Sequence, residues 1–132
     1  MQGVDIQGVE IFASGTWNGD DYSDTDLDVM VDANEKTKDK FSPFLKLSHD
    51  DSQRLAKNSG LSVDELPALG WMENLRRVGS KLIADFKNVP KHLAELMQVG
   101  AYRTRSAEIW KDIDFDGMRF PFMLKAVGLL GA

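Results

Sequence analysis

The sequence predicts an α+β fold, in which a mixed, mostly antiparallel sheet or small β-barrel is accompanied by peripheral helices. Three observations favour this class: many short segments alternate apolar and polar residues, a few helical stretches are interspersed among them, and no regular strand-helix-strand rhythm is present. The chain has 132 residues, of which 42% are hydrophobic and 28% charged. These values predict one compact domain over residues 1–132.

The N-terminal third is expected to form a strand followed by a helix. Residues 4–17 read as extended structure with a shift near Gly8. Residues 18–28 are rich in Asp, Gly, Ser and Thr, which cap helix starts, and they lead into an apolar stripe with spacings of three and four. We therefore expect an amphipathic helix that ends near Lys38.

The middle of the chain is expected to contain a short strand and a hairpin. Residues 44–49 alternate and bring His49 to the end of a strand. Residues 50–60 are polar and indicate a turn or one helical segment. Between residues 67 and 89, two alternating runs flank Val78-Gly79-Ser80, which predicts a β-hairpin that turns there.

The last third is expected to add a helix and a second hairpin. Pro90 precedes an apolar stripe that ends at Gly100, which is typical of a three-turn helix. Residues 102–115 are extended, and Asp116-Gly117 is a strong signal for a tight hairpin turn. The return strand follows over residues 118–124, and a last apolar run over residues 126–130 completes the sheet.

Composition excludes several classes of function. The net charge of −5 argues against a broad basic surface for nucleic acid. The chain has no cysteine, which removes disulfides, thiolate zinc sites and cysteine nucleophiles. No apolar run is long enough for a membrane span, and the N-terminus lacks the features of a signal peptide. We expect a soluble protein without a cofactor, and the cytosol fits this composition.

The acidic residues of the predicted first helix invite comparison with a calcium-binding loop. Their spacing over residues 24–35 matches the ligand positions of a calcium-binding helix-loop-helix loop. The sixth position of such a loop requires glycine for a sharp turn, and Val29 stands there instead. We interpret these residues as an ordinary acidic helix face and expect no metal site.

Two histidines and one serine are the candidates for nucleophilic catalysis. His92 falls in the first turn of a predicted helix and is expected to point to solvent, whereas His49 ends a strand. Ser106 and Glu108 are two residues apart in a predicted strand and therefore project to the same face. A serine needs a nearby base and donors for the oxyanion, so spacing alone favours a structural serine beside a salt-bridging glutamate.

Several segments resemble the Mu-like phage capsid-maturation proteases, with their order and gaps intact over nearly the whole chain. The resemblance covers an early helix, a histidine region, a serine region and a closing strand. The matching segments are residues 22–28, then 44–51 with 67–77, then 82–90 with 100–103 and 106–109, and finally 124–131.

The resemblance implies a serine endopeptidase with the herpesvirus-assemblin-like fold, a small β-barrel surrounded by helices. Such enzymes trim scaffold and capsid proteins inside the procapsid in the host cytoplasm. The implied substrates are thus the scaffold protein and the major capsid protein, with no nucleic acid or membrane partner, and a homo-oligomer is left open. In this family the nucleophile corresponds to Ser106 and the general base to His49.

The third catalytic residue is where this sequence departs from the wider group. Relatives carry His, Asp or Glu on the strand after that of the nucleophile, and Lys125 and Ala126 occupy that stretch here. Glu108 is our substitute because it shares the face of Ser106. Asp50 and a serine–histidine dyad are the alternatives. Backbone N–H groups and an arginine near residues 103–105, Arg103 or Arg105, are candidates for the oxyanion hole.

Two further expectations concern the class of function and the extent of the chain. The main alternative to a protease is a non-catalytic scaffold or capsid-assembly domain that keeps the protease fold. A generic esterase is disfavoured, because the sequence has no Gly-x-Ser-x-Gly turn. The sequence stops inside an apolar strand pattern, so we expect the natural product to extend beyond Ala132. The resemblance implies a C-terminal, helix-rich scaffolding segment, and Ala132 is then a boundary chosen for expression or a point of self-cleavage.

Overall fold

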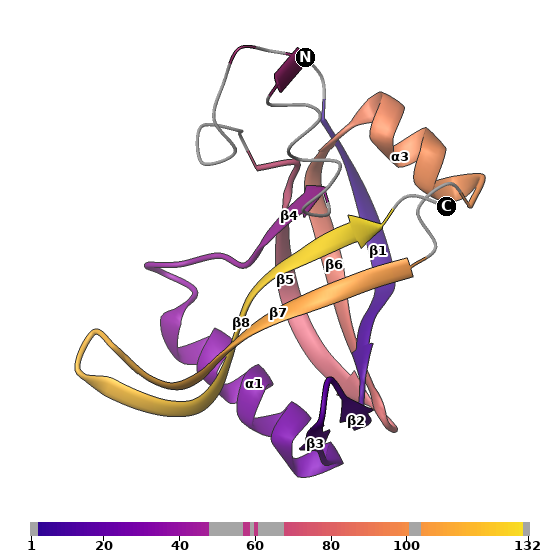
Figure 1. The fold of residues 1–132 in the computed structure, drawn as a ribbon. Helices are drawn as coiled ribbons and strands as arrows, with labels where there is room; N and C mark the ends of the chain where they lie inside the picture. Colours follow the sequence, from indigo (N-terminus) through magenta and orange to yellow (C-terminus); the bar gives the residue numbers. More distant parts are fainter. Residues whose placement is uncertain (1–2, 48–56, 59, 61–67, 101–103, 131–132) are drawn as a thin grey trace.

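A computed structural model of the chain describes residues 3–47, 57–58, 60, 68–100 and 104–130. These residues form eight strands and two principal helices (Figure 1). In chain order they are β1 (Gly3–Ala13), β2 (Gly15–Trp17), β3 (Asp20–Tyr22), α1 (Asp24–Thr37), β4 (Phe44–Leu47), β5 (Trp71–Val78), β6 (Lys81–Pro90), α3 (Lys91–Gln98), β7 (Thr104–Phe115) and β8 (Met118–Leu130). No helix in the described ranges is long and apolar enough to cross a membrane.

Six of the strands form one sheet in the order β1-β6-β5-β4-β8-β7, and β2 and β3 form a separate small hairpin. All neighbours in the large sheet are antiparallel except β4 and β8, which are parallel. The predicted α+β class with a mostly antiparallel sheet is therefore confirmed.

The predicted closed barrel is wrong for the part of the chain that the structure describes. Closure requires hydrogen bonds between β1 and β7, which are the two edges of the sheet. No such pairing links the described residues of these strands. Residues 10–13 of β1 and 105–107 of β7 line a cavity at this open edge.

Both principal helices lie where the sequence predicts, although α3 has eight residues, about two turns, and not the three turns expected. Ser23 caps α1 by accepting a hydrogen bond from the Asp26 N–H, while the Asp26 carboxylate accepts one from the Ser23 N–H. Helix α1 ends at Thr37, and Lys38 is its C-cap residue, as expected. Helix α3 follows Pro90, and Gly100 takes a positive φ of 85° just beyond its end.

The predicted hairpins are also present. The strands β5 and β6 are joined by Gly79 and Ser80, inside the predicted turn. Asp116 and Gly117 form the turn of the β7–β8 hairpin, with φ values of 53° and 81°. Positive φ at both residues is what a two-residue type I′ turn requires. The final apolar run is a continuation of β8, not an added strand, because β8 is unbroken to Leu130.

The core divides into two clusters. The larger one packs the inner face of the sheet against both helices, with Leu27, Leu45, Phe86 and Val127 almost completely buried. The smaller one holds the far end of the β7–β8 hairpin against the end of α1, where the ring centroids of Phe41 and Trp110 lie 5.2 Å apart. The β7–β8 hairpin therefore packs into the smaller cluster near its turn and into the larger cluster at its other end.

Asp85 of β6 joins three strands where the pairing is irregular. The register of β1 shifts around Gly8, which has a φ of 71°, and that of β5 shifts around Asn74, with a φ of 54°. The Asp85 carboxylate accepts hydrogen bonds from the Gly8 N–H (2.9 Å) and the Asn74 side-chain amide (3.0 Å), and it pairs with Arg76 (3.2 Å). These contacts lower the pKa of Asp85, with the Gly8 N–H as the largest cause.

We predict that Asp85→Ala lowers the free energy of unfolding by about 2–3 kcal/mol, because Gly8 and Arg76 lose their acceptor. Urea unfolding at neutral pH measures this difference. The control is Asp32→Ala, which removes an exposed ion pair to Lys36 and is expected to cost less than about 0.5 kcal/mol. Equal losses in the two variants would contradict the structural role of Asp85.

The same contact predicts a dependence on pH. Since the pKa of Asp85 is lower in the folded state, its contribution is complete above the ordinary Asp pKa of about 3.9. The contribution is lost as the pH falls through the folded pKa. Unfolding curves between neutral and strongly acidic pH are thus expected to converge for the wild type and Asp85→Ala at the acidic end, and a constant difference would contradict this.

Candidate functional site

Ser106 lies near the start of β7 with its side chain exposed. Its partner in β8 is Gly128, and on the other side of β8 the partner of Gly128 is Lys46 of β4. Residues paired across a sheet point to the same face, so Ser106 and Lys46 lie on one face on either side of a residue without a side chain. This outer face is opposite the one on which Val127 joins the core.

Glu108 lies two residues along β7 on the same face as Ser106, as predicted, and its partner in β8 is Ala126. Its carboxylate pairs with the Lys46 ammonium at 2.6 Å and approaches that of Lys125 at 3.8 Å. The pairing of β7 and β8 is irregular just after Glu108, and this bulge directs Lys125 toward the carboxylate. All three charged side chains are about one-third exposed, so Glu108 is shared by two cations next to Ser106.

The predicted base and its weaker orienting candidate, His49 and Asp50, lie outside the described residues, as does Arg103. The strand that leads to His49 is described up to Leu47, which pairs with Leu129. Leu129 in turn pairs with Arg105, the residue before Ser106. The predicted strand at residues 44–49 is therefore confirmed over residues 44–47, and it ends two strands away from the start of β7.

The control histidine is placed as expected. His92 lies in the first turn of α3 and is exposed, whereas its neighbour Leu93 is buried. The stretch over residues 50–60 falls mostly outside the described ranges, and its predicted turn or helical segment stays a prediction.

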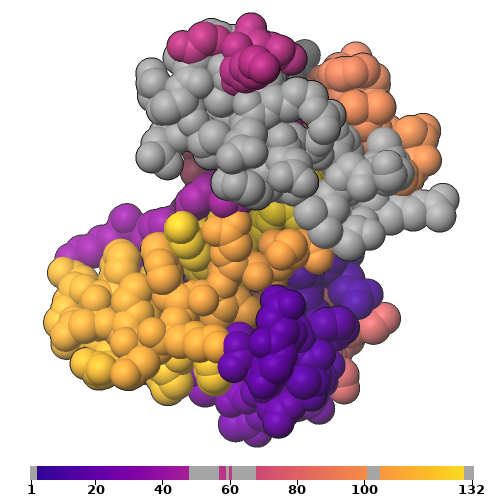
Figure 2. All heavy atoms as spheres, in the orientation of Figure 1, coloured from indigo at the N-terminus to yellow at the C-terminus, as the bar shows by residue number. Residues whose placement is uncertain are grey.

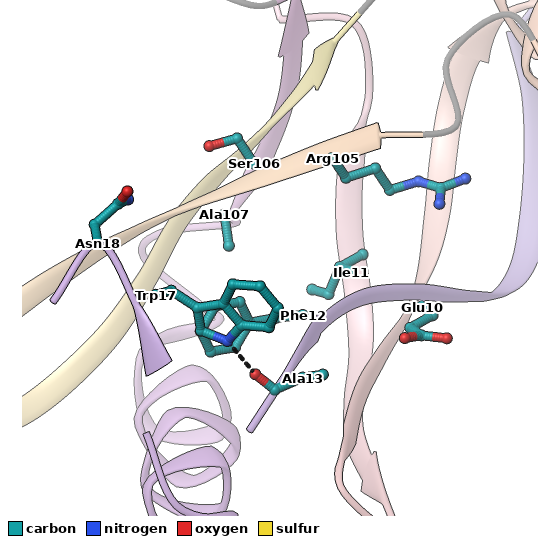
Figure 3. Close-up of a pocket in the computed structure, with 9 residues that line it drawn as sticks. All are labelled: Glu10, Ile11, Phe12, Ala13, Trp17, Asn18, Arg105, Ser106 and Ala107. Carbon is teal, nitrogen blue, oxygen red and sulfur yellow. Dashed lines mark hydrogen bonds between the residues drawn. The ribbon is translucent and has the colours of Figure 1, made fainter. Parts of the chain in front are cut away.

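A cavity of about 450 Å³ lies between the two edge strands on the inner side of the sheet. It is lined by Glu10, Ile11, Phe12, Ala13, Trp17, Asn18, Arg105, Ser106 and Ala107. Figure 3 shows Ala107 pointing toward Trp17 and Phe12, whereas the Ser106 hydroxyl points away on the other side of β7. Figure 2 shows the N-terminal strands and β7 adjoining at the surface.

The cavity has an apolar end and a charged end. The ring centroids of Phe12 and Trp17 lie 6.3 Å apart, and the Trp17 indole N–H donates a 2.8 Å hydrogen bond to the Ala13 carbonyl. The side chains of Arg105 and Glu10 extend away from this ring pair (Figure 3). Glu10 also pairs with Lys81 at 3.2 Å.

Sequence reasoning missed Trp17 and Asn18 as cavity residues. They belong to the β2–β3 hairpin, which turns at Asn18 and Gly19 with φ values of 54° and 82°. Asn-Gly is a strong hairpin signal, but the surrounding Asp and Ser residues were interpreted only as the approach to a helix. An ion pair between Asp20 and Lys111 ties this hairpin to β7.

The acidic series of residues 24–35 lies within α1, as the absence of a loop glycine predicts. Several of these carboxylates form ion pairs. Asp32 pairs with Lys36 and Glu35 with Lys38, and Asp28 pairs with Arg77 of β5. Within the described ranges, no group of three or more His, Asp or Glu side chains is arranged to hold a metal ion.

We compared the chain with protein-family models, with curated proteins and with solved structures, and none of them matches it.

Proposed function

We propose that this chain is a serine endopeptidase of the phage prohead type, with Ser106 as nucleophile and His49 as general base. Its proposed substrates are scaffold and capsid proteins inside an assembling procapsid. The proposal keeps the helices and mostly antiparallel sheet of the herpesvirus-assemblin-like fold, without the closed barrel, which the described strands do not form. It rests on the resemblance of the histidine and serine regions, together with the pairing around Gly128.

The pairing around Gly128 is the observation that carries the proposal. Ser106 and Lys46 are both partners of Gly128, so the strand that leads to His49 and the strand of Ser106 flank the same short stretch of β8. These segments are about 60 residues apart in the sequence, and only the fold brings them together. Strand β7 carries the proposed nucleophile, and the described part of β4 reaches this end of the sheet at Leu47, two residues before His49.

The proposed reaction is ordinary acyl transfer. The Ser106 oxygen attacks the scissile carbonyl while His49 accepts the hydroxyl proton. His49 then gives this proton to the leaving amine, and a water molecule hydrolyses the acyl-enzyme with His49 again as base. The exposure of Ser106 makes its hydroxyl accessible to a polypeptide substrate.

A second candidate is a non-catalytic scaffold or capsid-assembly domain. It is favoured by the ion pairs of Glu108, because Lys46 and Lys125 engage the carboxylate that would otherwise orient the imidazole. A serine–histidine dyad reconciles these ion pairs with catalysis. Activity measurements on variants distinguish a triad with Glu108, a serine–histidine dyad and a non-catalytic domain.

We predict that Ser106→Ala abolishes cleavage, lowering turnover by at least about a thousandfold, because it removes the attacking oxygen. The measurement is incubation with the scaffold and capsid partners followed by intact-mass analysis. Since Ser106 is exposed, the urea midpoint is expected to stay at the wild-type value. Cleavage by Ser106→Ala at the wild-type rate would refute the nucleophile.

His49→Ala is expected to lose activity to a similar degree, whereas His92→Ala stays active. The base must approach the serine oxygen to about 3 Å in the productive state, and His92 is exposed on α3. The same cleavage assay measures both variants. Comparable defects in the two would indicate a folding effect and contradict the role of His49.

Glu108→Gln is expected to lower turnover by about ten- to a thousandfold, leaving more activity than Ser106→Ala. The control is Lys46→Met, which breaks the 2.6 Å ion pair but keeps the carboxylate. Full activity of Glu108→Gln, or the same turnover for Glu108→Gln and Lys46→Met, would assign Glu108 to the ion pair alone.

A further inference from the structure

We propose that Asn18 is a site of spontaneous deamidation, in which its side-chain amide is converted to a carboxylate through a cyclic imide formed with Gly19. The product is aspartate or isoaspartate, and the isoaspartate form changes the wall of the cavity at Trp17. This inference is independent of the proposed function, because the reaction needs only water and the atoms of the β2–β3 turn.

The reaction takes place at the turn of the β2–β3 hairpin, where Gly19 follows Asn18. The Gly19 backbone nitrogen attacks the side-chain carbonyl carbon of Asn18, and the side-chain nitrogen leaves as ammonia with the proton of the Gly19 N–H. Water then opens the imide ring. Cleavage between the Gly19 nitrogen and the side-chain carbonyl gives aspartate. Cleavage between the same nitrogen and the backbone carbonyl gives isoaspartate, in which the main chain runs through the former side chain.

The structure leaves this turn accessible to the reaction. Asn18 and Gly19 are both exposed, and the space around the Gly19 Cα is open. In the described part of the chain the Asn18 amide has no hydrogen-bond partner, and Figure 3 shows it directed away from the Trp17 ring. Contacts within the described ranges therefore do not hold the amide away from the Gly19 nitrogen.

Ring closure requires rotation about the backbone bonds of Asn18, so the turn must open locally. The strands β2 and β3 have three residues each and form a sheet of their own. A two-stranded hairpin of this size is marginally stable. The ion pair of Asp20 with Lys111 is about half exposed on both sides and adds little. Opening of this turn is therefore expected to cost little free energy.

A second turn of the same geometry offers a matched comparison. Asp116 and Gly117 have φ values of 53° and 81°, against 54° and 82° in the β2–β3 turn, and they are also exposed. Their hairpin differs, because β7 and β8 pair along the whole length of β7 and Phe115 packs against Phe41 beside the turn. We therefore expect an asparagine at position 116 to react more slowly than Asn18.

Isoaspartate at position 18 alters the wall of the cavity. It adds one carbon atom to the backbone, which the two-residue turn of the hairpin does not accommodate. The pairing of Trp17 with Asp20 lies next to the turn and is expected to be lost. Since Trp17 and Asn18 both line the cavity, the modification changes its shape and adds a negative charge.

The test compares both turns in one protein, the Asp116→Asn variant, during incubation in mildly alkaline buffer. Peptide mapping with mass analysis measures the conversion of each asparagine over time. We expect Asn18 to convert at least about tenfold faster than the asparagine at position 116. The control is the same protein in concentrated urea, where comparable rates are expected because neither hairpin is formed. Comparable rates in the folded protein, or faster conversion at position 116, would overturn the inference.

If Asp116→Asn does not fold, the wild type provides the comparison through the rate at Asn18 in native buffer and in urea. The native rate is expected to lie within about tenfold of the rate in urea, because the turn opens readily. A larger reduction in the native state would overturn the site.

The effect on the cavity is measured on the isoaspartate form after chromatographic separation. We expect the nuclear magnetic resonance signal of the Trp17 indole N–H to shift, with the indole signals of Trp71 and Trp110 unchanged. The matched control is Asn18→Asp, which adds the same charge without the extra backbone carbon and is expected to shift the Trp17 signal less. An unchanged Trp17 signal in the isoaspartate form, or an equal shift in Asn18→Asp, would overturn the effect on the cavity wall.

Discussion

The arrangement of the candidate site depends on the pairing of β8 with two strands at once. Near its C-terminal end β8 is antiparallel to β7 and parallel to β4, so Gly128 has Ser106 on one side and Lys46 on the other. Alternation along these strands puts Val127 in the core and leaves Ser106 and Glu108 on the outer face. A shift of one residue in the β7–β8 ladder would turn Ser106 toward the core, so the buried side chains of β8 also fix the orientation of the candidate nucleophile.

The open edge of the sheet places a cavity next to the candidate site. In the described residues, the edges β1 and β7 approach each other at a cavity without a hydrogen-bonded ladder, and the β2–β3 hairpin adds Trp17 to the cavity wall. Asp85 anchors the bulges that bend β1 and β5, and the ion pair of Asp20 with Lys111 ties the hairpin to β7. The irregular parts of the sheet thus shape the space beside Ser106, whereas its regular ladders set the direction in which Ser106 points.

Local features of the fold could be predicted from the sequence, and distant pairings could not. The turn at Asp116 and Gly117 and the helix before Gly100 depend on residues that are neighbours in the chain, so their signals are complete in a short window. The parallel pairing of β4 with β8 joins residues about 80 positions apart, and alternation alone does not specify a partner. The expected barrel is wrong for the described strands for the same reason, since a pairing of β1 with β7 would join residues about 100 positions apart and alternation does not specify it.

At the candidate site, spacing correctly predicted that Ser106 and Glu108 share a face. It did not predict that Lys46 would reach Glu108, because β4 is separated from β7 by more than 50 residues of sequence. The Asn18-Gly19 turn was available as a signal, but its place beside Ser106 depends on the open edge of the sheet.

The most direct measurement of the central claim is covalent labelling of the intact protein with an active-site phosphonate, followed by mass analysis and peptide mapping. We predict one adduct on Ser106 in the wild type and in His92→Ala, and none in Ser106→Ala or His49→Ala. Adduct formation at another residue, or equal labelling of the Ser106→Ala protein, would contradict the assignment of Ser106 as the nucleophile.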